Sequence, residues 1–385
     1  MNKFYVYAIC LAMAFSACKE KQHNEDTFRV LEIGDPVTLP DLSDLFDKVE
    51  LIFLENRDSA LFYNVKKFYI TESRYFLFCS RNYTVYSFDR DGRFLFNTSH
   101  LRGQGAGYFA IVTDFLLNPV TGNMEFLDPY GNIYVYDTSS VFIDKIALPK
   151  EIGILNDFQS IGDSLYMFYQ PKFENDLNST IWVYSKVTGK LIVKQPFKEL
   201  YPRGFVSGDP LHFFNDGKCQ YFAAGRQDNN LYRIEPQSEG LLYPEYAIRF
   251  KDRPLSPKVL GDDPRRFLKN REETGYSILC RKIIGDKYWI ITYALNNNGY
   301  IYILNRQSDQ FICFNHKFKS GNMMLDPIYV DNEYLYSIVD PAYLSAIFPD
   351  YKFDGQTEKK VRALTEGDNF IIVKYRFKKD LLSGI

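Results

Sequence analysis

The sequence predicts an all-β fold made of repeated four-stranded units, and three observations support this prediction. Aromatic residues are abundant, with 30 Tyr and 33 Phe, and they fall in short runs bounded by Gly, Asp and Asn. Equivalent turn positions recur at a spacing of 48 residues, at Asp89, Asp137 and Ser185. A lone hairpin is marginal in water, so such units must pack against one another. About six units at this period indicate a six-bladed β-propeller of four-stranded antiparallel blades with short helical insertions. A pair of β-sandwiches is the competing fold, and it explains the regular turns less well.

The first unit, residues 65–96, shows how each blade is expected to form. Its runs are rich in β-branched and aromatic residues, which favour strands, and Asp91-Gly92 suits a tight hairpin turn because glycine tolerates positive φ. The second and third units keep the same period, whereas the last three are looser in register. The units expected after the first are residues 111–146, 158–193, 212–250, 277–314 and 327–377.

An N-terminal strand is left over and is expected to close the ring. Either residues 28–33 or residues 49–54 supply it, beside residues 370–377 of the last unit. Both alternatives remain open, and residues 28–385 are expected to form a single propeller domain.

Two insertions in the connections between strands are predicted to be helical. Asp263 at the N-cap and Pro264 at the first helical position indicate a short helix that ends at Gly275. The second insertion lies at residues 340–367 and begins with Asp-Pro, with a further helix near residues 357–364. Insertions of this kind collect on one face of a repeat protein, often the binding face.

The first residues have the pattern of a secretory signal. One lysine is followed by an apolar run that is too short to span a membrane, and small residues precede Cys18. This ending resembles the lipobox of bacterial lipoproteins, which implies a signal peptide at residues 1–17 and lipidation of Cys18. An ordinary signal peptide with an incidental cysteine is the alternative. Residues 18–27 form a polar tether.

Charge and cysteine usage narrow the possible functions. The chain has 46 basic and 48 acidic side chains without a basic stripe, so no nucleic-acid partner is expected. The later cysteines lie in apolar runs without a C-x-x-C pair, which favours buried free thiols over disulfides or a zinc site. These cysteines are Cys79, Cys219, Cys280 and Cys313. No cofactor or metal is expected.

Two neighbouring segments carry a family resemblance. Residues 86–94, Tyr-Ser-Phe-Asp-Arg-Asp-Gly-Arg-Phe, and residues 102–108, Arg-Gly-Gln-Gly-Ala-Gly-Tyr, resemble the six-bladed β-propeller lipoproteins of Bacteroidetes, of the TolB-like or NHL-like type. In that family the loop is usually Arg-Gly-x-Gly-Pro-Gly-Glu-Tyr, whereas this chain has Ala106 and lacks the glutamate. The resemblance implies an outer-membrane lipoprotein, surface-exposed or periplasmic, that touches the membrane only through its lipid anchor.

The glycine-rich loop is the most distinctive candidate for ligand binding. Its three glycines at alternate positions let backbone N–H groups point into one concavity that could hold an anion. The candidate ligand-binding residues are Arg102, Gly103, Gly105 and Tyr108. The alternative is a tight connection between blades in which Arg102 and Tyr108 are packing anchors.

Other motifs give little support for catalysis. Asp89 and Asp91 lack the rest of a calcium loop and are interpreted as turn residues. His100 is the best-placed histidine, and the G-x-S-x-G motif of nucleophilic hydrolases is absent. Acids from different blades can still meet at the propeller mouth without fixed spacing.

The leading functional prediction is therefore a binding lipoprotein that recognises a glycan, a peptide or a protein partner. Arg102, Tyr108 and residues 262–274 are expected near its site. A hydrolase or lyase acting on a glycan or lactone, with acids or a metal at the central channel, is the alternative, and a scaffold subunit of an envelope complex is a third possibility.

Overall fold

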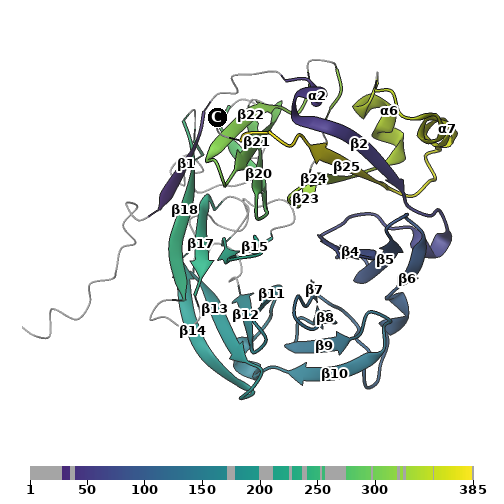
Figure 1. Ribbon diagram of the computed structural model, residues 1–385. Helices are drawn as coiled ribbons and strands as arrows, with labels where there is room; N and C mark the ends of the chain where they lie inside the picture. The colour runs from purple at the N-terminus through teal and green to yellow at the C-terminus, as the bar shows by residue number, and fades with distance from the viewer. Residues whose placement is uncertain are drawn as a thin grey trace, which may run out of the picture.

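Six β-sheets stand in a ring around a central axis in the computed structural model of the protein (Figure 1). The structure describes residues 28–34, 40–170, 178–198, 211–224, 228–235, 241–251, 254–255, 275–295, 298–318, 321–323, 327–349 and 351–383. The predicted six-bladed β-propeller is confirmed. The signal peptide, Cys18 and the tether lie outside the described residues.

Each blade is a meander whose first strand lies nearest the axis (Figure 1). Blade 1 consists of β3 (Lys67–Ile70), β4 (Arg74–Cys79), β5 (Thr84–Asp89) and β6 (Phe94–Asn97). Blade 2 consists of β7 (Asp114–Leu117), β8 (Met124–Leu127), β9 (Asn132–Tyr136) and β10 (Phe142–Ala147). Blade 3 consists of β11 (Asp157–Ile161), β12 (Leu165–Gln170), β13 (Asn178–Ser185) and β14 (Lys190–Lys198).

The last three blades follow the same plan with strands of more variable length. Blade 4 consists of β15 (Phe213–Asn215), β16 (Gln220–Phe222), β17 (Asn230–Ile234) and β18 (Leu242–Phe250). Blade 5 consists of β19 (Ile278–Ile284), β20 (Tyr288–Leu295), β21 (Asn298–Asn305) and β22 (Gln310–Asn315). Blade 6 contains β23 (Pro327–Val330), β24 (Tyr334–Val339) and β25 (Ile371–Phe377).

The ring is closed by β2 (Phe46–Phe53), the fourth strand of blade 6. It pairs antiparallel with β25, from Phe46 opposite Phe377 to Phe53 opposite Ile371. Of the two closing strands that the sequence left open, residues 49–54 are therefore correct and residues 28–33 are wrong. The latter form β1 (Arg29–Ile33), which pairs parallel with β18 as a fifth strand of blade 4.

Burial explains the composition of the strands. Nearly every residue of β4 and β5 is buried because neighbouring blades cover both faces of these central strands. The outer strand β14 alternates between exposed and half-buried positions. Aromatic rings fill the contacts between blades. The ring centroid of Phe115 in blade 2 lies 5.8 Å from that of Phe78 in blade 1 and 5.2 Å from that of Phe126 in its own blade. The abundant Phe and Tyr therefore stabilise the ring of blades.

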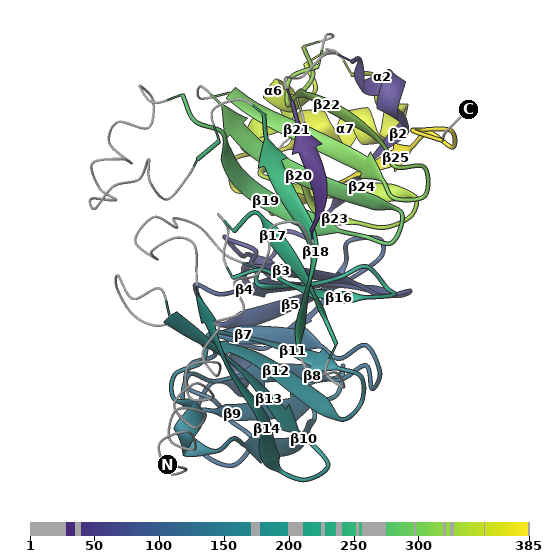
Figure 2. The ribbon, with the colours of Figure 1, turned by 90° about the vertical axis from the view of Figure 1, so that its left-hand side faces the viewer.

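Short helices occupy the connections. The 3-10 helices are η2 (Asp58–Ala60), η3 (Ser99–Leu101) and η4 (Lys150–Ile152), and α2 (Leu42–Leu45) precedes β2. The predicted helices of the second insertion are confirmed as α6 (Pro341–Ile347) and α7 (Gly355–Ala363), which lie together beside blade 6 (Figure 2). Asp340 caps α6 by accepting a hydrogen bond from Ala342 N at 2.9 Å. The helix predicted at residues 263–275 lies, except for Gly275, outside the described residues. Within the described ranges, no helix has the length and hydropathy that a membrane span requires.

Candidate functional site

The glycine-rich loop connects blade 1 to blade 2 as a compact turn. The guanidinium of Arg102 lies 5.8 Å from the centre of the Tyr83 ring, and the Tyr108 ring lies against the backbone of Gly103. The N–H of Gly103 donates to Phe109 O at 3.1 Å, and the N–H of Tyr108 donates to Gly105 O at 3.2 Å. Two of the amides that an anion would need are thus engaged within the loop.

Gly105 and Gly107 of this loop both have positive φ, and at Gly107 a side chain would also have no room. Gly107 has φ +79°, and a Cβ there would lie 2.8 Å from the Phe142 ring. Its carbonyl accepts a hydrogen bond from the hydroxyl of Tyr136. These contacts account for the loop as a connection between blades. They do not test ligand binding, so the binding role of Arg102, Gly103, Gly105 and Tyr108 stays a prediction.

The aspartates interpreted as turn residues do form turns. Asp89 Oδ1 accepts hydrogen bonds from the N–H groups of Asp91 and Arg93, both at 2.9 Å. Among the residues that the structure describes, no group of three or more His, Cys, Asp or Glu could hold a metal ion. Among the described residues, Cys79, Cys219, Cys280 and Cys313 form no disulfide, as the sequence predicts. Cys79 and Cys313 are buried, whereas Cys219 and Cys280 are half-buried.

The six inner strands converge on a cavity of about 360 Å³ in the central channel. Every blade contributes to its lining, and aromatic and aliphatic side chains dominate it. Asn215 and Gly217, where β15 ends, are exposed and form part of this lining, so the cavity is open to solvent there. The polar and aromatic residues that line it are Lys66, Lys67, Lys282, Gln159, Asn215, Phe68, Tyr69, Phe213, Phe214 and Tyr329.

Where the inner strands begin, a buried ionic cluster joins blades 1 to 4. Asp114, fully buried at the first position of β7, lies 2.6 Å from the ammonium of Lys67 and 3.5 Å from that of Lys66. Its Oδ2 also accepts a hydrogen bond from Phe158 N at 3.1 Å. Asp157, which begins β11, lies 3.1 Å from Lys66.

His212 extends this cluster to blade 4. Its Nε2 lies 3.4 Å from Asp157 Oδ2, and its Nδ1 lies 3.1 Å from Ala223 O. The Tyr169 ring packs beside it with a centroid distance of 4.3 Å. Further along the channel, Lys282 donates to Asp228 O at 2.7 Å. We call Lys66, Lys67, Asp114, Asp157 and His212 the ionic cluster.

Burial and charge shift the acidity of these groups. Full burial raises the pKa of Asp114 despite the attraction of Lys67 and Lys66. Burial by itself would lower the pKa of Lys67. The attraction of Asp114 and other nearby groups is stronger than this effect, so the pKa of Lys67 is raised. Burial also raises the pKa of Tyr69 to about 12. Perturbed titratable groups beside a cavity mark the central channel as the leading candidate site.

His100, the best-placed histidine in the sequence, lies outside the ionic cluster, and no motif of the sequence pointed to the cluster itself. His100 is exposed, and its Nδ1 lies 3.0 Å from Asn97 O in the same turn. A signal for the cluster was present, because Lys67, Asp114 and Asp157 each stand at the first position of the first strand of a blade. Charged residues at the same position of three successive blades are expected to lie close together near the axis.

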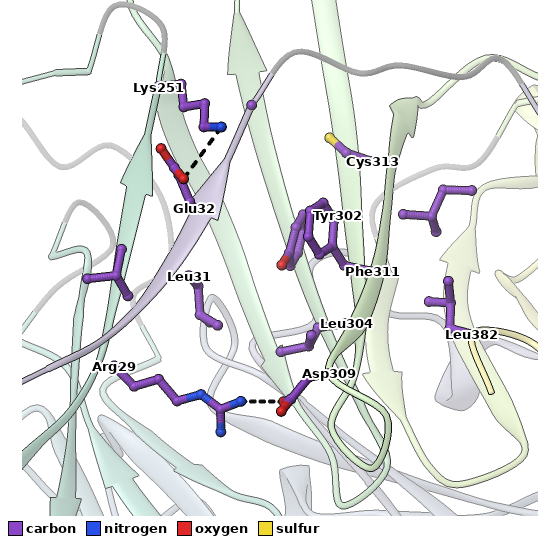
Figure 3. Close-up of a pocket in the computed structure, with 13 residues that line it drawn as sticks. Arg29, Leu31, Glu32, Lys251, Tyr302, Leu304, Asp309, Phe311, Cys313 and Leu382 are labelled. Carbon is purple, nitrogen blue, oxygen red and sulfur yellow. Dashed lines mark ion pairs between the residues drawn. The ribbon is translucent and has the colours of Figure 1, made fainter. Parts of the chain in front are cut away.

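A second cavity, of about 820 Å³, lies at the outer rim between blades 4 and 5. Figure 3 shows β1 along one side of it and β22 along the other. Arg29 forms an ion pair with Asp309 at one end, and Glu32 lies 3.4 Å from Lys251 near the other. We call this cavity the rim groove.

Comparison with solved structures agrees with the propeller fold. A Bacteroides fragilis protein whose description calls it exported matches with a TM-score of 0.73 and 16% identity, over 91% of this chain and 100% of that chain. Streptogramin B lyase matches with a TM-score of 0.41 and 12% identity, over 76% of this chain and 80% of that chain. The WD40 repeats of RRP9 match with a TM-score of 0.44 and 8% identity, over 88% of this chain and 99% of that chain. At such low sequence identity, structural similarity to the Bacteroides fragilis protein shows a shared fold, not a shared function. The two matches with TM-scores below 0.5 carry no argument.

The family assignment comes from the sequence itself. A search of the curated proteins found no match. One family model, described as Domain of unknown function (DUF4934), matches residues 29–376, which include all six blades. The chain therefore belongs to the DUF4934 family.

Proposed function

We propose that this protein is an envelope lipoprotein whose propeller binds the end of a glycan chain in the central channel. The observation that carries this proposal is the convergence of all six inner strands on one solvent-open cavity. Ligand cavities of proteins span about 300–1,000 Å³ and are mostly apolar with a few polar groups. A cavity of about 360 Å³ suits a terminal sugar unit better than a large ligand.

The lining has the chemistry that a sugar needs. Tyr69 and Tyr329 offer flat ring surfaces, and Gln159 and Asn215 carry amide groups that both donate and accept hydrogen bonds. The ammonium of Lys67 is already paired with Asp114. The cavity therefore favours a neutral, hydroxyl-rich ligand over a free anion.

The state of the two channel carboxylates favours binding over hydrolysis. A glycosidase needs one carboxyl group that gives up its proton to the leaving group and a second that acts on water or sugar. Asp114 and Asp157 are instead held in ion pairs with Lys66 and Lys67, with side chains 0% and 3% exposed. Their contacts support a structural role where the inner strands begin.

The proposed location in the cell envelope rests on the residues around Cys18. Small residues before this cysteine resemble a lipobox, and the structurally similar Bacteroides fragilis protein is described as exported. We expect metabolic labelling with a fatty acid to label the wild-type protein and not the Cys18→Ala variant. Equal labelling of both would contradict lipidation at this cysteine.

Glycan binding is tested by thermal unfolding with a panel of neutral oligosaccharides. A ligand at 100 times its Kd stabilises the folded state by about 2.7 kcal/mol. We expect one oligosaccharide to raise the midpoint for wild type and not for Gln159→Ala. Tyr130→Ala is the matched control, because Tyr130 is 77% exposed and is not part of the channel lining. Tyr108→Ala in the same assay tests the glycine-rich loop. Absence of any shift across the panel would refute glycan binding.

A further inference from the structure

The strand β1 is an unusual addition to the propeller. It pairs parallel with β18, whereas the other strand pairs of this sheet are antiparallel. Blade 4 thus already accepts an extra strand at its outer edge. Within the described part of the chain no strand pairs with the opposite edge of β1, which is the unpaired edge of this sheet.

The hydrogen-bond register shows which backbone groups face the open edge. Lys251 N donates to Ile33 O, so the backbone of Ile33 points towards β18. In a parallel pair, successive residues point their N–H and C=O groups to alternate sides. The backbone groups of Val30 and Glu32 therefore point towards the rim groove, two residues apart.

The other side of the rim groove is apolar. Phe311 of β22 is 52% exposed, and its ring stacks on that of Tyr302 with a centroid distance of 5.0 Å. Leu304 and Cys313 also line this side, and Leu31 of β1 lines the groove from the first side (Figure 3). An exposed aromatic ring beside an open strand edge is a surface that a partner can cover.

The charged residues of the rim groove are already paired with one another. Arg29 pairs with Asp309, and Glu32 pairs with Lys251, with each side chain between 54% and 59% exposed. These four charges sum to zero. The groove therefore selects an occupant by shape and backbone hydrogen bonding and not by charge.

We propose that the rim groove binds an extended, uncharged peptide segment of a partner protein, which adds a strand to the free edge of β1. Backbone donors and acceptors spaced two residues apart match another extended polypeptide, whereas a lipid offers no such row and a glycan has no strand repeat. The five residues of β1 span about 17 Å, which sets the length of the paired segment. Apolar side chains at alternate positions of the peptide would pack on the exposed ring of Phe311.

The test uses fluorescein-labelled peptides selected from a random heptapeptide library on residues 19–385, with binding read by fluorescence polarisation. Val30→Pro removes one N–H that faces the groove and leaves the bonds from β1 to β18 in place. Val30→Ala keeps this N–H and is the matched control. We expect Val30→Pro to weaken binding at least tenfold, Val30→Ala to change it less than threefold, and Phe311→Ser to weaken it about fivefold or more.

Three results would overturn the proposal. These are a library that yields no binder, equal binding to wild type and Val30→Pro, and a selected peptide that binds equally well after N-methylation of its backbone. Concentration-dependent dimerisation that Val30→Pro abolishes and the peptide does not inhibit would assign the edge to a second copy of the chain instead. The thermal midpoint of Val30→Pro checks that the propeller remains folded.

Discussion

Replacing Asp114 with Asn should destabilise the propeller strongly, although the two side chains have nearly the same shape. Asn can still accept the hydrogen bond from Phe158 N, but it removes the negative charge that faces Lys67 at 2.6 Å and Lys66 at 3.5 Å. The side chains of both lysines are at most 10% exposed. One buried positive charge is then left without compensation.

The size of the effect follows from burial. Removing one partner of a buried ion pair costs about 3–5 kcal/mol. Unfolding entropy near 2.1 cal/mol/K per residue gives about 0.75 kcal/mol/K for roughly 350 folded residues. The midpoint of thermal unfolding should therefore fall by about 4–7 °C.

The assay is circular dichroism of the wild type, Asp114→Asn, and the double variant Asp114→Asn with Lys67→Met at pH 7 and one scan rate. The double variant restores charge balance, since Lys66 and Asp157 remain paired at 3.1 Å. We expect it to recover more than half of the lost midpoint. A midpoint for Asp114→Asn within 1 °C of wild type, or a double variant no more stable than the single one, would refute the electrostatic reasoning.

Two further predictions concern the loop and the titration of buried groups. Gly107→Ala should cost about 2–3 kcal/mol, because left-handed φ and the Phe142 ring both oppose a Cβ, whereas Gly122→Ala, with φ +72° and nothing within 4 Å, should cost only about 1 kcal/mol. Urea midpoints measure both, and equal losses would contradict the packing argument. Burial raises the pKa of Tyr69 and of Cys79 to about 12 each. The folded protein keeps these protons longer than the unfolded chain, so their stabilisation is full below about pH 8.5 and is lost towards pH 12. The urea midpoint of the wild type should fall between pH 8 and pH 11, and Cys79→Ala should reduce this fall at the lower end of the range. A midpoint that stays constant would contradict the raised pKa values.

The blades were predictable because their signals are local. Strand runs, the turn at Asp91-Gly92 and the cap at Asp340 depend on neighbours within a few residues, so the sequence displays them directly. The closing strand was left ambiguous for the opposite reason. Residues 28–33 and 49–54 are similar apolar runs, and only pairing with β18 or β25, some 200 to 300 residues away, separates them.

The candidate sites depend on contacts that the sequence does not display. Asp114 and Asp157 share the first position of an inner strand with Lys67, but that shared position is recognisable only once the strand boundaries are known. Their ion pairs form because the ring brings several blades to one point. The loop at Arg102 stood out because glycine patterns are conspicuous, yet its hydrogen bonds and ring contacts are those of a connection between blades. The rim groove depends on the parallel docking of β1, which no local pattern predicts.

The ionic cluster and the open cavity belong to one arrangement. Apolar side chains of similar volume often stabilise a core as well as a buried ion pair does, so stability alone does not explain two lysines and two aspartates at the axis. Charged groups tolerate only a few partners at fixed distances, and the pairs from Lys66 to Asp114 and Asp157 link the starts of β3, β7 and β11. These ion pairs hold the inner strands of blades 1 to 3 together beside the cavity, which Lys66 and Lys67 also line. Loss of Asp114 is therefore expected to change the shape of the cavity as well as the stability of the ring.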